Sequence, residues 1–181
     1  SDADANMLDG LCELLKSIQE SAGVVKVEKA ILAEKERAFG AESKEAGVAL
    51  YNLGLAYMGL GDYAEQRDVL ERALPIMERE HGKDSTDVAN VLNNLGTAYV
   101  SLGDHAKARD LYERSLAITG REYGKDSTEV AVVLGNLGCA YGALGDYAKK
   151  RDMLERALAI KERTYGRDHP NVATTLTNLG N

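Results

Sequence analysis

The sequence predicts an all-α fold, a solenoid of antiparallel helix pairs with about nine helices in total. A stretch of 42 residues, 88–129, returns at 130–171 with 25 of the 42 positions identical. A third copy precedes them at 46–87, and nineteen positions hold the same residue in all three copies. Each copy repeats large apolar residues at the spacing of a helix with one buried face. Repeats of this length build solenoids, in which each unit packs only against its neighbours.

We expect the whole chain, residues 1–181, to form a single array. Residues 4–45 are a degenerate first copy, in which Gln19 and Glu20 replace the Gly-Asp pair found at the middle of later copies. The full copies 46–87, 88–129 and 130–171 follow, and residues 172–181 repeat the first part of another. Such a half repeat leaves Leu176 and Leu179 poorly covered, so self-association through this last helix is one expectation.

The first helix of each full copy carries its apolar residues at offsets of 3, 7 and 10, as in Leu50, Leu53, Tyr57 and Leu60. Gly54 lies beside this stripe, where a small residue lets a second helix approach closely. The pair at 61–62, Gly-Asp, then ends the first helix, because glycine readily adopts the left-handed conformation that caps a helix.

A second helix is expected from about Ala64 to Glu80. Pro75 lies inside it, and we expect a kink or a lost hydrogen bond there. Glycines stop this helix in each copy, at Gly82, Gly124 and Gly166. The aspartates two residues later are predicted to cap the next helix, with Glu129 completing a capping box in one copy: Asp84, Asp126 and Asp168. On the outer face, Asp68 and Arg72 have the four-residue spacing of an ion pair within one helix.

Composition excludes several classes of function. The 29 acidic and 22 basic residues give a net charge of −7, which disfavours nucleic acid as a partner. Only Cys12 and Cys139 are present, so we expect no disulfide framework and a reducing compartment. No apolar run approaches the length of a membrane span, which predicts a cytoplasmic protein with no membrane partner. The scattered histidines match no metal spacing, and no nucleophile, base or cofactor motif is present, so we predict neither an enzyme nor a bound cofactor.

The pattern L-x-x-L-G-x-A-Y-x-x-L-G-D-Y followed by E-R-A-L resembles the tetratricopeptide repeat. The longer unit of this chain, with N-N-L-G, R-A-L-A-I and Y-G-x-D-H-P, is similar to the kinesin light chain class of that repeat. This resemblance implies a right-handed superhelix, whose concave groove is lined by the first helix of each unit and binds extended peptides or other protein surfaces.

Helical geometry selects the residues that face this groove, because they lie opposite the buried stripe of the first helices. These positions contain no charged residue, so recognition of a terminal carboxylate by basic side chains, as in some members of the family, is not expected. The candidate peptide-binding residues are Tyr51, Asn52, Leu55, Asn90, Asn93, Asn94, Thr97, Asn136 and Asn178.

Four of these candidates recur at the same position of successive copies and form what we call the Asn ladder: Asn52, Asn94, Asn136 and Asn178. An amide carries two donors and an acceptor, so the ladder could hold the backbone of an extended peptide. Alternatively, each asparagine hydrogen-bonds the neighbouring helix or water. Tyr51 has two interpretations as well, an anchor for a partner or a packed side chain.

The sequence therefore predicts a protein-interaction scaffold that binds a peptide or a partner protein through its groove. Two alternatives remain open at this point. The array could be the sensing or autoinhibitory part of a larger signalling protein with an NTPase domain elsewhere, or a self-associating fragment.

Overall fold

The chain is all-α, as predicted. The computed structural model describes the backbone of residues 2–180 and the side chains of residues 19–180. Eight helices follow one another without a strand among the described residues: α1 (Asp2–Phe39), α2 (Lys44–Leu60), α3 (Tyr63–His81), α4 (Thr86–Ser101), α5 (His105–Glu122), α6 (Thr128–Ala143), α7 (Tyr147–Tyr165) and α8 (Pro170–Gly180). They divide into two compact units, Ser1–Ile76 and Met77–Asn181, and the boundary falls within α3, directly after Pro75 and Ile76.

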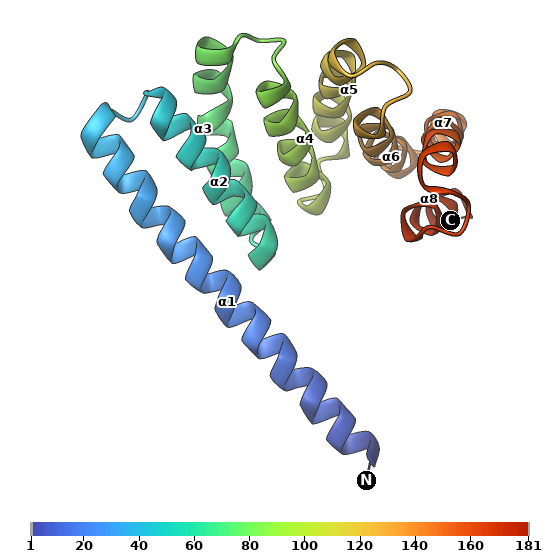
Figure 1. The fold of residues 1–181 in the computed structure, drawn as a ribbon, viewed down its shortest axis with the longest axis horizontal. Helices are drawn as coiled ribbons and strands as arrows, with labels where there is room; N and C mark the ends of the chain where they lie inside the picture. Colours follow the sequence, from blue (N-terminus) through green and yellow to red (C-terminus); the bar gives the residue numbers. More distant parts are fainter. Residues whose placement is uncertain (1, 181) are drawn as a thin grey trace. The chain divides into compact units, whose positions relative to one another are not determined.

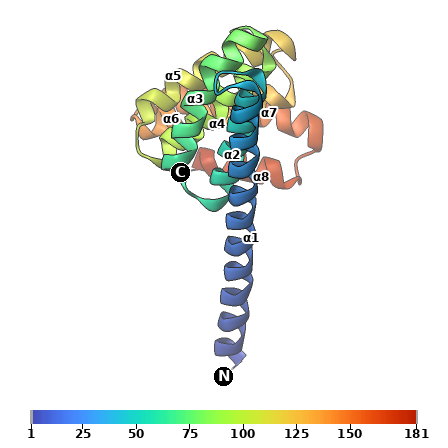
Figure 2. The ribbon, with the colours of Figure 1, turned by 90° about the vertical axis from the view of Figure 1, so that its left-hand side faces the viewer.

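In the first unit, α1 is one continuous helix where the sequence predicted a helix pair. Figure 1 shows it lying beside α2, and in both views its N-terminal part projects past α2 (Figure 2). The reason is local. Gln19 stands at the position where the full copies have a glycine with positive φ, such as Gly61. Glutamine does not favour the positive φ that ends a helix, so the helix continues. The missing turn accounts for eight helices in place of about nine.

Glycines with a positive φ follow seven helices of the described chain, and they recur at a constant interval of half a repeat. They are Gly40, Gly61, Gly82, Gly103, Gly124, Gly145 and Gly166, with φ between 79° and 95°. The two halves of each repeat therefore have the same length. The predicted stops at Gly82, Gly124 and Gly166 are confirmed, and Pro75 lies within α3 without ending it.

The predicted aspartate caps are wrong. Ser85 and Ser127 cap α4 and α6, accepting hydrogen bonds from the backbone of Val88 at 3.3 Å and Val130 at 3.2 Å. Asp84 instead pairs with Arg121 of α5, with Nη1 and Oδ2 3.1 Å apart. Its hydrogen bond with Arg121 lowers the pKa of the Asp84 carboxyl. The last predicted cap, Asp168, is also not the residue that bonds α8, because the backbone of Asn171 donates to Nδ1 of His169 at 3.1 Å.

Small residues let the paired helices approach closely, as expected for Gly54. A β-carbon at that position would lie 2.6 Å from the Leu70 side chain. In the second unit, one at Gly96 would lie 2.7 Å from the ring of Tyr112, and one at Gly138 would lie 2.9 Å from Leu154. Each glycine thus makes room for a large buried residue of the following helix.

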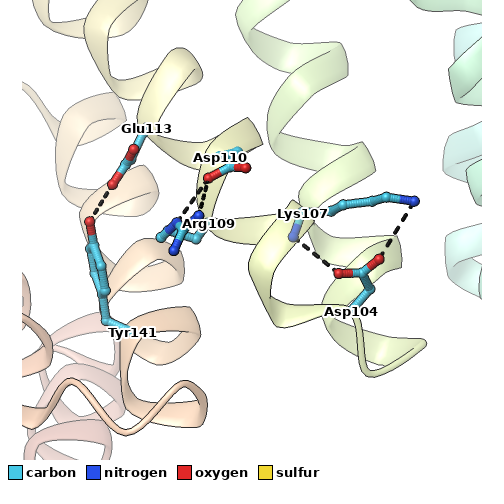
Figure 3. Close-up of polar contacts among 6 residues, drawn as sticks. All are labelled: Asp104, Lys107, Arg109, Asp110, Glu113 and Tyr141. Atoms are coloured by element: carbon cyan, nitrogen blue, oxygen red, sulfur yellow. Dashed lines mark hydrogen bonds and ion pairs between the residues drawn. The ribbon is translucent and has the colours of Figure 1, made fainter.

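Neighbouring repeats of the second unit are also joined by polar contacts. Figure 3 shows the Tyr141 hydroxyl of α6 donating to the Glu113 carboxylate of α5. This bond, together with burial, raises the pKa of Tyr141 to about 12. Arg109 bonds its neighbour Asp110 at 2.8 Å in the same view. The sequence predicted ion pairs within one helix on this face. The bond between Tyr141 and Glu113 instead connects one repeat to the next.

Alkaline pH is expected to destabilise the fold through Tyr112. Burial raises the pKa of this hydroxyl to about 12, whereas an unfolded tyrosine ionises near 10, so between these values the unfolded chain binds fewer protons. The free energy of unfolding should therefore fall as pH rises above about 10. Urea unfolding at pH 9 and pH 11 should show a smaller fall for Tyr112→Phe than for the native chain. Equal falls would contradict this account of Tyr112.

Candidate functional site

In the first unit, the predicted surface lies on α2. Asn52 is exposed, while Tyr51 and Leu55 are half-buried. Val48 and Met58 of the same helix are exposed at 39% and 36%. This unit therefore presents a neutral, partly apolar helix face with one amide.

In the second unit, the predicted residues are spread over three helices. Asn90 is exposed, and the others are half-buried: Asn93, Asn94 and Thr97 on α4, Asn136 on α6 and Asn178 on α8. Thr97 is engaged within the fold, because its hydroxyl donates to the Asn93 carbonyl and shares a hydrogen bond with the Tyr112 hydroxyl, both at 3.1 Å.

One member of the Asn ladder bonds a neighbouring helix. Nδ2 of Asn136 donates to Oδ1 of Asn93 at 3.1 Å, which joins α6 to α4. This contact uses one N–H and one oxygen lone pair of the two amides and leaves other donors and acceptors on both. The same geometry cannot recur one repeat later, because Gly135 stands at the position equivalent to Asn93 and offers Asn178 no side chain.

A hollow of about 190 Å³ adjoins this amide pair, between α4, α5 and α6. We call it the amide hollow, and the residues that line it are Thr86, Ala89, Asn90, Asn93, Ser115, Thr119, Tyr123, Glu129, Val132 and Val133. The structure thus brings Asn90 and Asn93 together with three residues of α5 and its C-terminal end that the sequence analysis did not select. Glu129 also shows that this surface is not wholly uncharged.

The α5 hydroxyls in the amide hollow are held in place by backbone acceptors. Ser115 donates to the Ala89 carbonyl at 2.9 Å, and Thr119 donates to the Ser115 carbonyl at 2.7 Å. Both side chains are buried, and the equivalents of Ser115 in the other copies are Ala73 and Ala157. A hydroxyl where other copies have alanine was the sequence feature that could have identified this part of the hollow.

A cation lies at the equivalent place one repeat later. Lys161 of α7 occupies the position of Thr119, is half-buried, and donates from Nζ to Oγ1 of Thr175 on α8 at 2.9 Å. Burial lowers the pKa of this ammonium group. Lys161 was not among the predicted residues, because the prediction covered the first helix of each repeat and Lys161 lies on the second.

Cys139 and the metal-binding residue types remain to be placed among the described side chains. Cys139 is half-buried on α6, and burial raises the pKa of its thiol, which keeps it protonated at neutral pH. Within residues 19–180 no group of three or more His, Cys, Asp or Glu side chains is arranged to hold a metal ion. In the part of the chain that the structure describes, no helix has both the length and the apolar character to cross a bilayer.

Comparison with known proteins identifies the repeats. The model of the tetratricopeptide repeat family matches residues 45–121 and 102–162. A comparison with curated protein sequences found no match.

The fold is similar to solved tetratricopeptide structures. The TPR-like repeats of a protein described as a kinesin light chain from Podosopora anserina superpose with a TM-score of 0.76 and 22% identity, covering 96% of this chain and 83% of that one. BtubC (BKLC) from P. vanneervenii gives 0.69 and 22%, covering 92% and 82%. The N-terminal domain of stress-induced protein-1 from C. elegans gives 0.53 and 18%, covering 76% and 96%.

The family match spans more than half of the sequence. The first two structures and this chain share the kinesin light chain-like repeat architecture. The chain belongs to the tetratricopeptide repeat family and has a fold of the kinesin light chain-like type.

Proposed function

We propose that this chain is a protein-interaction scaffold that binds an extended peptide segment of a partner across α4 and α6. The observation that carries the proposal is the amide hollow, where Asn90 and Asn93 adjoin the hydroxyls of Ser115 and Thr119. The family supports the general role, because its repeats act through protein contacts, and the hollow supports the place.

The chemistry of the amide hollow suits a peptide backbone. An extended peptide exposes alternating N–H and C=O groups, and amide side chains offer both donors and acceptors for them. Val132, which is 50% exposed at the edge of the hollow, adds an apolar contact for a side chain of the partner. The segment is thus held chiefly through its main chain, with selectivity from one apolar position.

The test places a charge in the hollow without disturbing the core. A peptide library is selected on the native chain, and the affinity of the enriched peptide is then measured for Val132→Glu. Desolvating the added carboxylate should weaken binding by about tenfold or more. Leu144→Glu is the matched control, because Leu144 is similarly exposed at 42% and lies outside the hollow. Equal affinity of native and Val132→Glu would remove this surface from the function.

A specific observation favours self-association through α8 as a second candidate. Leu176 is 48% exposed, although its equivalent Leu134 is fully buried. A second copy that covers Leu176 would remove apolar surface from water. Light scattering across a concentration series should then show a dimer for the native chain and a monomer for Leu176→Glu. A native monomer at every concentration would contradict this candidate.

A further inference from the structure

An arginine on the second helix pairs with a glutamate of the preceding repeat in two successive places. In the first unit, Nη2 of Arg72 lies 2.7 Å from Oε1 of Glu36 on α1. In the second unit, Nη2 of Arg114 lies 2.6 Å from Oε1 of Glu78 on α3. Both pairs join residues that are 36 positions apart. The pattern predicts that the third arginine of the series, Arg156, should meet an acid at position 120.

Position 120 is a glycine. Arg156 is exposed on α7, and no hydrogen bond or ion pair joins it to any residue within the described part of the chain. The third repeat therefore keeps the cation of the pair and lacks the carboxylate. It also lacks the volume of that side chain, since nothing lies within 4 Å of where a β-carbon on Gly120 would be.

A pocket of about 400 Å³ opens at this place, within the usual range of ligand-binding pockets. We call it the Gly120 pocket, and it is lined by Leu116, Ala117, Gly120, Arg121, Lys125, Val130 and Arg156. It shares no residue with the amide hollow, so it is a separate site. Its floor is apolar, with Leu116 and Val130 belonging to or packed against a core cluster.

The charged residues that line the Gly120 pocket are all positive, although the chain as a whole has a net charge of −7. Arg121 already binds Asp84. Arg156 and Lys125 are exposed, and neither pairs with an acid among the side chains of residues 19–180. The pocket thus offers two uncompensated cations above an apolar floor, which is the complement of a carboxylate on a short aliphatic stem.

We propose that the Gly120 pocket docks a glutamate side chain, flanked by an apolar residue, from a segment of a partner protein. The fold itself indicates the occupant, because Glu36 and Glu78 fill the equivalent place beside Arg72 and Arg114. The partner's carboxylate pairs with Arg156, and its aliphatic carbons contact Leu116 and Ala117. This site goes beyond the peptide surface proposed above and does not depend on it.

The experiment uses a fluorescein-labelled peptide of alternating leucine and glutamate, with a leucine–glutamine peptide as the uncharged counterpart. Fluorescence anisotropy measures their affinity for the intact native chain, Arg156→Gln and Gly120→Glu. The last variant supplies the missing acid from within and should occupy the pocket. We expect both variants to bind the glutamate peptide at least about tenfold more weakly than the native chain does.

Gly59→Glu is the matched control, because it adds the same charge at another helical glycine with open space around it. It should bind within about twofold of the native chain. Circular dichroism verifies that each variant is folded. The proposal is wrong if the native chain fails to bind the glutamate peptide, if it binds the glutamine peptide equally well, or if Gly120→Glu binds as the native chain does.

Discussion

Replacing Leu134 with alanine is expected to lower the free energy of unfolding by about 2–5 kcal/mol. Leu134 is fully buried on α6, in a cluster with Val130, Ala131, Ala157 and Ile160. Truncation removes apolar contacts and leaves a cavity, because the helices around it are fixed by their own hydrogen bonds and can close the space only in part. Urea unfolding followed by circular dichroism measures the loss.

The repeat provides a matched control for this variant at Leu176, the same position of the next copy. This leucine is 48% exposed, so Leu176→Ala leaves no closed cavity and should cost less than about 1 kcal/mol. The comparison holds residue type and helix position constant and changes burial alone. Equal losses for the two variants would contradict the burial that the structure assigns to them.

A single methyl group at Gly96 is expected to lower the free energy of unfolding by about 1–3 kcal/mol. The new β-carbon would lie 2.7 Å from Cε1 of Tyr112, well inside van der Waals contact. Tyr112 is 2% exposed, and its hydroxyl is bonded to Thr97, so the ring has little room to move away. Overpacking therefore outweighs the gain in helix propensity from alanine. Thermal and urea unfolding of Gly96→Ala measure the effect.

The opposite sign is expected for Gly135→Ala on α6. No atom lies within 4 Å of the position of its β-carbon, so the substitution changes only the conformational freedom of the backbone. Alanine should raise the free energy of unfolding by roughly 0.5–1 kcal/mol. Two glycine-to-alanine changes in equivalent helices thus give opposite results if the spacing of α4 and α5 is as described. Stabilisation by both would show that Tyr112 moves freely.

The fold was predictable because the same pattern of apolar residues and glycines occurs in three copies. One copy of the pattern in residues 46–87 would have left the helix boundaries open, but nineteen shared positions fix the stripe and the glycine stops. The predicted helix pair is wrong at α1, because similarity in register does not imply a turn. Register follows from apolar spacing, whereas a turn also needs a residue that ends the helix, and Gln19 does not.

The residue types alone do not determine which of two adjacent residues, Asp84 or Ser85, caps α4. Asp84 and Ser85 are both good N-caps by residue type. The structure assigns the cap to Ser85, and Asp84 meets Arg121 from the next repeat, 37 positions away. Arg72 is a similar case, since its ion pair is with Glu36 and not with Asp68 in the same helix. In both places the charged side chain pairs with another repeat, a contact that local sequence spacing does not predict.

The candidate site was predictable only in part, because its residues come from both helices of a pair. Asn90 and Asn93 were predicted and line the amide hollow, and of the two alternatives for Asn136 the structure shows the bond to another helix. Ser115 and Thr119 were not predicted, because they lie on the second helix of their copy. Where a second helix comes close to the first helix of the next unit, its exceptional residues belong to the same surface.

The glycines with positive φ recur at half the length of the repeat, so successive helices alternate between two roles, the first and the second helix of a pair. Gain or loss of one whole repeat moves the chain by a full period, so each later helix keeps its role in its pair. Gain or loss of half a repeat preserves every helix length and every glycine stop, but it exchanges the roles of the two helices, and the stripe of Leu92 and Leu95 would then face the wrong neighbour. Duplication of a full copy within residues 46–171 therefore adds helices in pairs.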